Sequence, residues 1–181
     1  MCKLVENKIR FQTVYKGNFL DVKKDNVVLP NGKNSTREWI NHPGAVVVVP
    51  ILPNGKIALI RQFRYAMGSE FIELPAGKID KGETPDECAI RELEEEIGFK
   101  TKNLNFIAMI HPAIGFANEN MSLYLATDLV QTNINRDSDE FLELMPTSLE
   151  HALDLVWSNK ITDVKTIIGI LWYQKIYQER K

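Results

Sequence analysis

The residues whose types and spacing could perform chemistry are clustered in one short segment: Arg91, Glu92, Glu95 and Glu96. On an α-helix, side chains three and four positions apart share a face, so we expect the three carboxylates to lie on one flank. We expect Arg91 to pair with Glu95 and to leave Glu92 and Glu96 without an equivalent partner. The remaining repulsion between carboxylates predicts a bound divalent cation.

The ligand type narrows the choice of cation. Carboxylate oxygens without a set of Cys or His ligands suit Mg²⁺ or Mn²⁺ and disfavour structural Zn²⁺. Because Mg²⁺ keeps several waters, positions remain for the phosphates of a substrate. Taken alone, a run such as Glu92-Leu93-Glu94-Glu95-Glu96 is more often the solvated face of an amphipathic helix. The residues around the run decide between these two interpretations.

Polar residues and glycines stand at fixed intervals across residues 77–99: Gly77, Glu83, Arg91, Glu92, Glu95, Glu96 and Gly98. This segment resembles the Nudix box and matches its pattern without a gap. The resemblance implies a Nudix hydrolase of the α/β class, an α/β/α sandwich with a mixed sheet. It also implies a reaction in which a metal-activated water attacks one phosphorus of a diphosphate joined to another group.

The same resemblance implies a role for each charged residue of the box. Glu92 and Glu96 would bind Mg²⁺, with Mn²⁺ as the alternative. Glu95 would be a further metal ligand or would orient the water, and Arg91 would hold the carboxylates in position through paired hydrogen bonds. Arg91 and Glu95 are therefore predicted catalytic residues.

Two further positions complete the predicted metal site. Glu83 would pair with Arg91 or join the metal ligands. The carbonyl of Ala76 would be another ligand, because Leu74-Pro75-Ala76-Gly77 matches the common lead-in to the box in this family.

Outside the box, the chain from Arg37 onwards looks most like an ADP-ribose pyrophosphatase. Arg37 and Glu38 match an Arg-Glu pair that contacts substrate across a dimer in such enzymes. Arg64, in Arg61-Gln62-Phe63-Arg64-Tyr65, matches a phosphate-binding arginine. These three residues are the predicted substrate-binding residues, and the resemblance implies a homodimer.

A loop after the box would supply the remaining catalytic residue. The segment that ends at Glu119 matches a loop that carries an acidic residue near the reaction centre, so Glu119 is the candidate general base or water-orienting carboxylate. The loop departs from the family pattern because two residues separate Pro112 from Gly115. A weaker candidate for contact with substrate is Glu140, in a later acidic segment.

The implied reaction is the hydrolysis of ADP-ribose to AMP and ribose 5-phosphate. One alternative is a pyrophosphatase for another nucleotide sugar, such as GDP-mannose, or for a related dinucleotide. The other is a Nudix-like ligand sensor that has lost catalysis, which the complete set of box carboxylates disfavours.

A helix must carry the box carboxylates, and the sequence marks both of its ends. Thr84 and Glu87 form a capping box around Pro85, and Gly98 is a suitable stop. Apolar residues recur at helical spacing on the side expected to pack on the sheet: Ile90, Leu93 and Ile97.

Strands should surround this helix. Residues 8–39, with turns at Lys16-Gly17-Asn18 and Pro30-Asn31-Gly32-Lys33, predict a small antiparallel sheet. Residues 45–49 and 56–63 predict a hairpin. Further strands are expected at 70–74, 104–110, 122–127 and 141–145, and helices at 149–159 and 163–178. In the last helix we expect the core residues to be Val164, Ile167, Ile168, Leu171 and Ile176.

The whole chain is close to an average soluble protein in composition. With 22 basic and 24 acidic side chains its formal charge is −2, which favours neither nucleic acid nor a membrane as partner. Cys2 and Cys88 suggest no disulfide framework, and the N-terminus lacks the apolar core of a secretion signal, so we expect a cytoplasmic protein. We expect an N-terminal β extension at residues 1–42, used for dimerisation, and a Nudix hydrolase domain at residues 43–181.

Overall fold

The computed structural model describes residues 4–132 and 141–179, and the chain divides into two compact units. One unit comprises Met1–Pro43 and Ala113–Glu119, and the other comprises Gly44–Pro112 and Asn120–Lys181. The predicted Glu140 and Cys2 lie outside the described residues.

The first unit is built on an antiparallel sheet in the order β1-β2-β3. Its strands are β1 (Asn7–Lys16), β2 (Asp21–Val28) and β3 (Asn34–Ile40). The turn between β2 and β3 contains Gly32 at a φ of 83°, a left-handed conformation that glycine adopts without strain. Residues 113–119 join this unit through a parallel bridge between Ile40 and Ala117. The strands expected in the first forty residues are confirmed.

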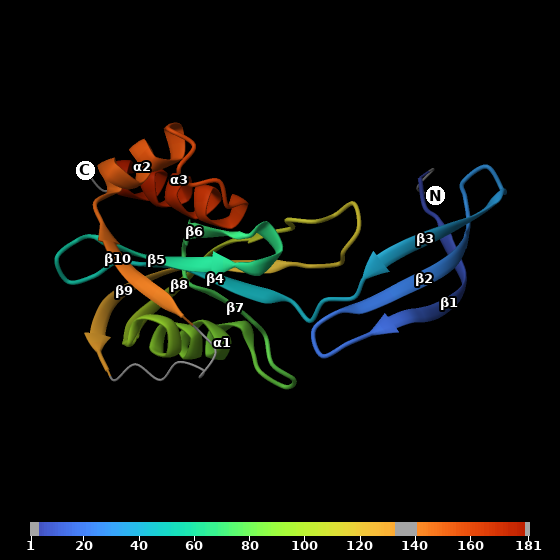
Figure 1. Cartoon of the computed structure of the whole chain (residues 1–181), viewed down its shortest axis with the longest axis horizontal. Coiled ribbons are helices and arrows are strands. Elements are labelled where there is room, and N and C mark those ends of the chain that lie inside the picture. The colour runs from blue at the N-terminus through green and yellow to red at the C-terminus, as the bar shows by residue number, and fades with distance from the viewer. Residues whose placement is uncertain (1–3, 133–140, 180–181) are drawn as a thin grey trace. The chain divides into compact units, whose positions relative to one another are not determined.

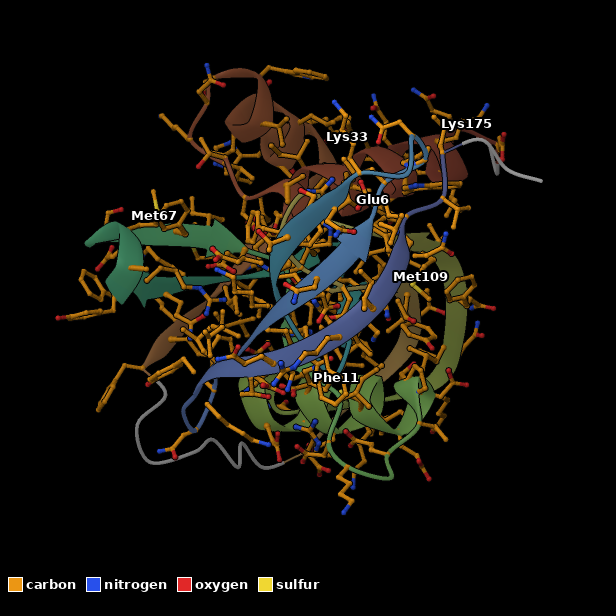
Figure 2. The ribbon with its side chains drawn as sticks, turned by 90° about the vertical axis from the view of Figure 1, so that its right-hand side faces the viewer. Glu6, Phe11, Lys33, Met67, Met109 and Lys175 are labelled. Atoms are coloured by element: carbon orange, nitrogen blue, oxygen red, sulfur yellow. The ribbon has the colours of Figure 1, made fainter. Side chains whose placement is uncertain are left out.

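The second unit contains two sheets. The four-stranded sheet has the order β7-β4-β9-β8, with β7 (Ala76–Lys78), β4 (Ala45–Pro50), β9 (Met121–Gln131) and β8 (Phe99–Ile110). It is mixed, because β4 and β9 run parallel while the other pairs are antiparallel. The three-stranded sheet has the order β10-β5-β6, with β10 (Leu142–Thr147), β5 (Ile57–Arg64) and β6 (Ser69–Glu73). A 3₁₀ turn, η1 (Tyr65–Met67), links β5 to β6, and Figure 2 labels Met67 there.

Helices cover both faces of these sheets (Figure 1): α2 (Leu149–Trp157) and α3 (Val164–Glu179) on one side, and α1 (Pro85–Glu92) on the other. The fully buried strand β4 shows why. Val47 and Val49 belong to the core beneath α2 and α3, whereas Val46 and Val48 belong to the core beneath α1, because successive strand residues point to opposite faces. The predicted α/β/α sandwich with a mixed sheet is confirmed. None of the described helices is long and apolar enough to cross a membrane.

The hairpin expected from residues 45–49 and 56–63 is wrong. The two strands form, but β4 and β5 belong to different sheets and share only the isolated bridge between Ile51 and Ile57. Each is already paired along both edges, β4 with β7 and β9, and β5 with β6 and β10. A central strand has no edge left for a hairpin partner, and a short loop alone does not reveal this.

The last helix packs against the core through some of the expected residues, but its most buried positions are others. Val164 is 48% exposed, and Ile167, Ile168 and Ile176 are only partly buried against the core. The buried positions of α3 include two polar residues: Lys165, Thr166, Gly169, Ile170 and Tyr173. Apolar spacing could not identify this face, because the burial of Lys165 and Thr166 depends on hydrogen bonds to distant residues.

Candidate active site

The start of α1 is set by local hydrogen bonds. Thr84 Oγ1 accepts a hydrogen bond from the backbone N–H of Glu87 at 3.3 Å, and a Glu87 carboxylate oxygen accepts one from the Thr84 N–H at 2.8 Å. Pro85 occupies the first helical position. The predicted capping box is confirmed, and it places the residues that follow on consecutive turns.

The helix does not continue as one regular α-helix to Gly98. It ends at Glu92 and is followed by a π-helical turn, η2 (Leu93–Ile97), which Gly98 closes at a φ of 72°. Glu95 and Glu96 therefore lie on a wider turn than Arg91 and Glu92, so the expectation of simple α-helical spacing is wrong. Single π turns within helices occur frequently at functional sites.

The buried face of this segment also differs from the expected stripe. Leu93 and Ile97 are buried as predicted, but Ile90 is 37% exposed. Cys88 and Ala89 take its place in the core beneath α1. Burial raises the pKa of the Cys88 thiol to about 12, more than the charge of Arg91 lowers it.

Arg91 is the centre of the site. Its Nε and Nη2 donate to the two carboxylate oxygens of Glu83 at 2.8 and 3.0 Å, as predicted. Its Nη1 donates to Glu92 at 2.7 Å and to Glu95 at 2.8 Å. The expectation that Glu92 lacks a cationic partner is therefore wrong. We call Glu83, Arg91, Glu92 and Glu95 the Arg91 cluster.

Within the Arg91 cluster, Glu83 and Arg91 favour each other's charged forms. The hydrogen bond from Arg91 lowers the pKa of Glu83 to about 2, against a smaller opposing effect of burial. The carboxylates, Glu83 first, raise the pKa of the Arg91 guanidinium above its ordinary value. The guanidinium therefore stays charged at every pH at which the protein folds.

Glu92 and Glu96 are almost completely buried, at 7% and 3% exposure. Both contact the segment that leads into the box. A Cβ added to Gly77 would lie 1.7 Å from Glu92 Oε1, so only glycine leaves room for that carboxylate. Glu96 Oε2 accepts a hydrogen bond from the Ala76 N–H at 3.1 Å. The structure thus brings Glu92, Glu96 and the backbone at Ala76 together.

The oxygens of this site are of the type that Mg²⁺ and Mn²⁺ prefer. Among the residues that the structure describes, however, no three His, Cys, Asp or Glu side chains are grouped as a ready-made metal site. In the Arg91 cluster, the guanidinium contacts both Glu92 and Glu95. Their roles as metal ligands remain a prediction.

Arg64 lies at the end of β5 and is held by a residue that sequence analysis did not identify. Its Nε and Nη2 donate to the two carboxylate oxygens of Glu73, both at 2.7 Å. This bonding raises the pKa of Arg64, and the nearby charge of Glu96 contributes. Glu73 precedes the lead-in to the box by one residue, which is the only signal in the sequence that could have identified it.

The other predicted residues belong to the first unit. Arg37 bonds Glu6, and Glu38 accepts a hydrogen bond from Lys24 at 3.0 Å. Because consecutive strand residues point to opposite faces, Arg37 and Glu38 lie on opposite faces of β3. Glu119 lies 3.8 Å from Nε2 of His42 in the same unit.

Comparison with known proteins covers nearly the whole chain. Sequence families described as NUDIX domain and as nucleoside diphosphate sugar hydrolase N-terminal domain match residues 41–164 and 9–40. An ADP-ribose pyrophosphatase of Bacillus subtilis (strain 168) is 42% identical over 176 residues, covering 96% of this chain and 95% of the relative. A methanol dehydrogenase activator of Bacillus methanolicus is 37% identical over 177 residues, 96% of each chain. A crystal structure of an ADP compounds hydrolase shares the fold, with a TM-score of 0.87 and 24% sequence identity. The match covers 97% of this chain and 95% of that chain.

Proposed function

This chain belongs to the Nudix hydrolase family, and from that premise we propose that it hydrolyses ADP-ribose to AMP and ribose 5-phosphate with a divalent metal ion. The Arg91 cluster carries the proposal, because one guanidinium orders three carboxylates, of which Glu92 is buried beside the lead-in to the box. The nearly full-length similarity to a protein named ADP-ribose pyrophosphatase supports the choice of substrate.

We propose Mg²⁺ as the metal, with Mn²⁺ as the alternative. Glu92, Glu96 and the Ala76 carbonyl would hold it, with Glu95 as a further ligand or as the residue that orients the water. A bound ion supplies two effects, a lowered pKa of the attacking water and neutralisation of charge on the phosphate oxygens. Arg91 stays anchored whichever partner Glu92 takes, since Glu83 alone bonds two of its nitrogens.

We assign substrate contacts to Arg37, Glu38 and Arg64. The observation that supports Arg64 is its fixed guanidinium, which Glu73 holds at two nitrogens while the side chain stays 44% exposed. A planar, permanently charged group held in this way suits a phosphate. Glu119 is our candidate for the general base.

We also propose that the protein is a cytoplasmic homodimer, with residues 1–42 as the dimerisation region and 43–181 as the hydrolase domain. The free thiol of Cys88 is compatible with a reducing compartment. The dimer rests on the strand-rich first unit and on the likeness of Arg37 and Glu38 to a pair that acts across subunits.

The test is a product assay over nucleoside diphosphate derivatives with Mg²⁺ and with Mn²⁺. Glu92→Gln and Glu96→Gln should each reduce turnover of ADP-ribose by at least about 100-fold, because each removes one anionic group from the proposed metal site. Glu94→Gln is the matched control, since Glu94 lies on the same π turn but pairs with Lys100 at 3.0 Å. Near-parental turnover in both box variants would exclude the metal assignment.

The same assay separates the alternatives. Faster hydrolysis of GDP-mannose than of ADP-ribose would identify a pyrophosphatase for another nucleotide sugar. Binding of these compounds without hydrolysis under either metal would identify a ligand sensor.

A further inference from the structure

A buried charge network connects Arg64 to the beginning of the last helix. Glu73, which bonds Arg64, is 2% exposed, and Lys165 is 8% exposed. The ammonium group of Lys165 donates to Glu73 Oε2, and it also donates to Asp163 Oδ2 at 2.9 Å. Asp163 in turn accepts a hydrogen bond from the Thr166 N–H at 3.0 Å, as an N-cap residue does.

Burying the two ionic groups of Glu73 and Lys165 is costly unless each has a partner. Burial alone raises the pKa of Glu73, but the hydrogen bonds and charges of Arg64 and Lys165 outweigh it and hold the pKa below its ordinary value. Glu73 is therefore a carboxylate at neutral pH. Lys165 occupies Oε2 from the helix side, so it restricts the rotation of the carboxylate that orients Arg64.

The guanidinium of Arg64 is held along one edge only. Glu73 accepts hydrogen bonds from Nε and Nη2 of Arg64. Among the described residues, no hydrogen bond is formed by Nη1 of Arg64. Arg64, Glu73, Asp163 and Lys165 line a pocket of about 220 Å³ together with Met67 and Phe71. One edge of Arg64 is thus fixed by protein and the other is available to an anion.

The same network reaches the lead-in to the box. The Leu74 N–H donates to Thr166 Oγ1 at 2.8 Å, and the Ala76 N–H donates to Glu96 at 3.1 Å. Residues 73–76 are therefore held by the first turn of α3 on one side and by the box on the other. The charge of Glu96 also acts on Arg64, so the two sites are close neighbours.

We propose that Lys165 is a positioning residue that, through Glu73, orients the Arg64 guanidinium toward a phosphate of the nucleoside diphosphate substrate. This inference rests on the proposed function and extends it to the start of α3. Lys165 itself does not touch the substrate.

A double-mutant cycle tests the proposal. Lys165→Met should raise KM for ADP-ribose about tenfold while kcat changes less than about threefold, because a ground-state phosphate contact is weakened. Lys165→Arg should recover most of this loss, since it keeps the cation. In an Arg64→Ala background, Lys165→Met should have no further effect on KM, because the two residues act as one unit. Lys160→Met is the control, since Lys160 is exposed on the preceding loop.

An independent readout is calorimetric binding of the non-hydrolysable α,β-methylene analogue of ADP-ribose. It should weaken in Lys165→Met by the same factor as KM rises. If that variant does not fold, Glu73→Gln alone and Glu73→Gln combined with Lys165→Met should weaken binding equally, because Lys165 acts through Glu73.

The outcomes distinguish the two proposals. Parental binding in the Lys165 variants, or effects of Lys165→Met and Arg64→Ala that multiply, would overturn the role of Lys165 while leaving the hydrolase intact. A parent that binds the analogue but hydrolyses no diphosphate would overturn the proposed function, and the binding cycle would still decide on Lys165. Absence of binding by the parent would overturn both.

Discussion

At the scale of single residues, Gly77 contributes to the site because its lack of a side chain leaves room for Glu92. The carboxylate of Glu92 lies where a side chain of residue 77 would begin, so the first glycine of the box and Glu92 depend on each other. The contact explains why a residue without chemistry of its own belongs to a catalytic pattern.

Gly77→Ala should therefore destabilise the protein by about 1–3 kcal/mol, because Glu92 must move or the backbone must shift. Turnover should fall with it. Gly115→Ala is the control for stability, since nothing lies within 4 Å of a Cβ there and its φ is not positive, and it should change stability by less than about 0.5 kcal/mol. Urea unfolding measures both, and equal effects would contradict the contact.

The Glu83–Arg91 pair predicts a dependence of stability on pH. The folded pKa of Glu83 is about 2, below its ordinary value of 4.5, so the pair stabilises the fold fully above pH 4.5. That contribution is lost as the pH falls from 4.5 toward 2. The free energy of unfolding of the parent, minus that of Glu83→Gln, should stay constant above about pH 5 and shrink steadily below it.

Urea titrations across this pH range measure the difference directly. If this difference stayed the same down to about pH 2.5, Arg91 would not lower the pKa of Glu83 in the folded protein.

At the scale of elements, the α1–η2 segment combines a firmly defined start with an irregular end. The capping box and Pro85 define the first turn, whereas the π turn after Glu92 changes the direction of the last carboxylates. Glu95 and Glu96 therefore lie on the π-helical part of the segment, and Arg91 and Glu92 lie on its regular α-helical part.

Thr84→Ala should cost about 1 kcal/mol of stability, since it leaves the Glu87 N–H without its side-chain acceptor. Thr84→Ser should retain most of it, because serine caps equally well. Thermal unfolding of the two variants is the measurement. Indistinguishable midpoints for Ala and Ser would mean that the cap does not stabilise α1.

At the scale of the whole molecule, the first unit exposes large apolar side chains on β1. Ile9, Phe11 and Tyr15 on β1 are 59%, 67% and 58% exposed, and Figure 2 shows Phe11 on this strand. Exposed apolar patches of this kind mark interfaces. They support the proposed homodimer.

Sedimentation equilibrium should therefore give a mass twice the 20.7 kDa of one chain. Phe11→Lys should shift the protein toward monomer, because it places a charge in the proposed interface. Trp157→Lys, at a residue 69% exposed at the end of α2, should leave the mass unchanged. A single-chain mass for the parent at micromolar concentration would refute the dimer.

The sequence by itself determined the features that depend on near neighbours along the chain. The capping box at Thr84, the stop at Gly98 and the class of every major strand and helix involve residues a few positions apart or a strong apolar pattern. The box spacing identified the family for the same reason, because its chemistry is carried on one short segment.

Only the tertiary structure decided which distant residues meet. It placed β4 and β5 in separate sheets, where each pairs with other strands along both edges. It also buried Lys165 and Thr166, because Glu73 and Leu74, more than ninety positions away, form hydrogen bonds with them. The bond between Arg91 and Glu92 and the π turn also depend on packing around the helix. The spacing of apolar residues along the chain predicts which side chains are buried. A charged side chain is buried only where a partner lies beside it, and that partner is known only from the folded chain.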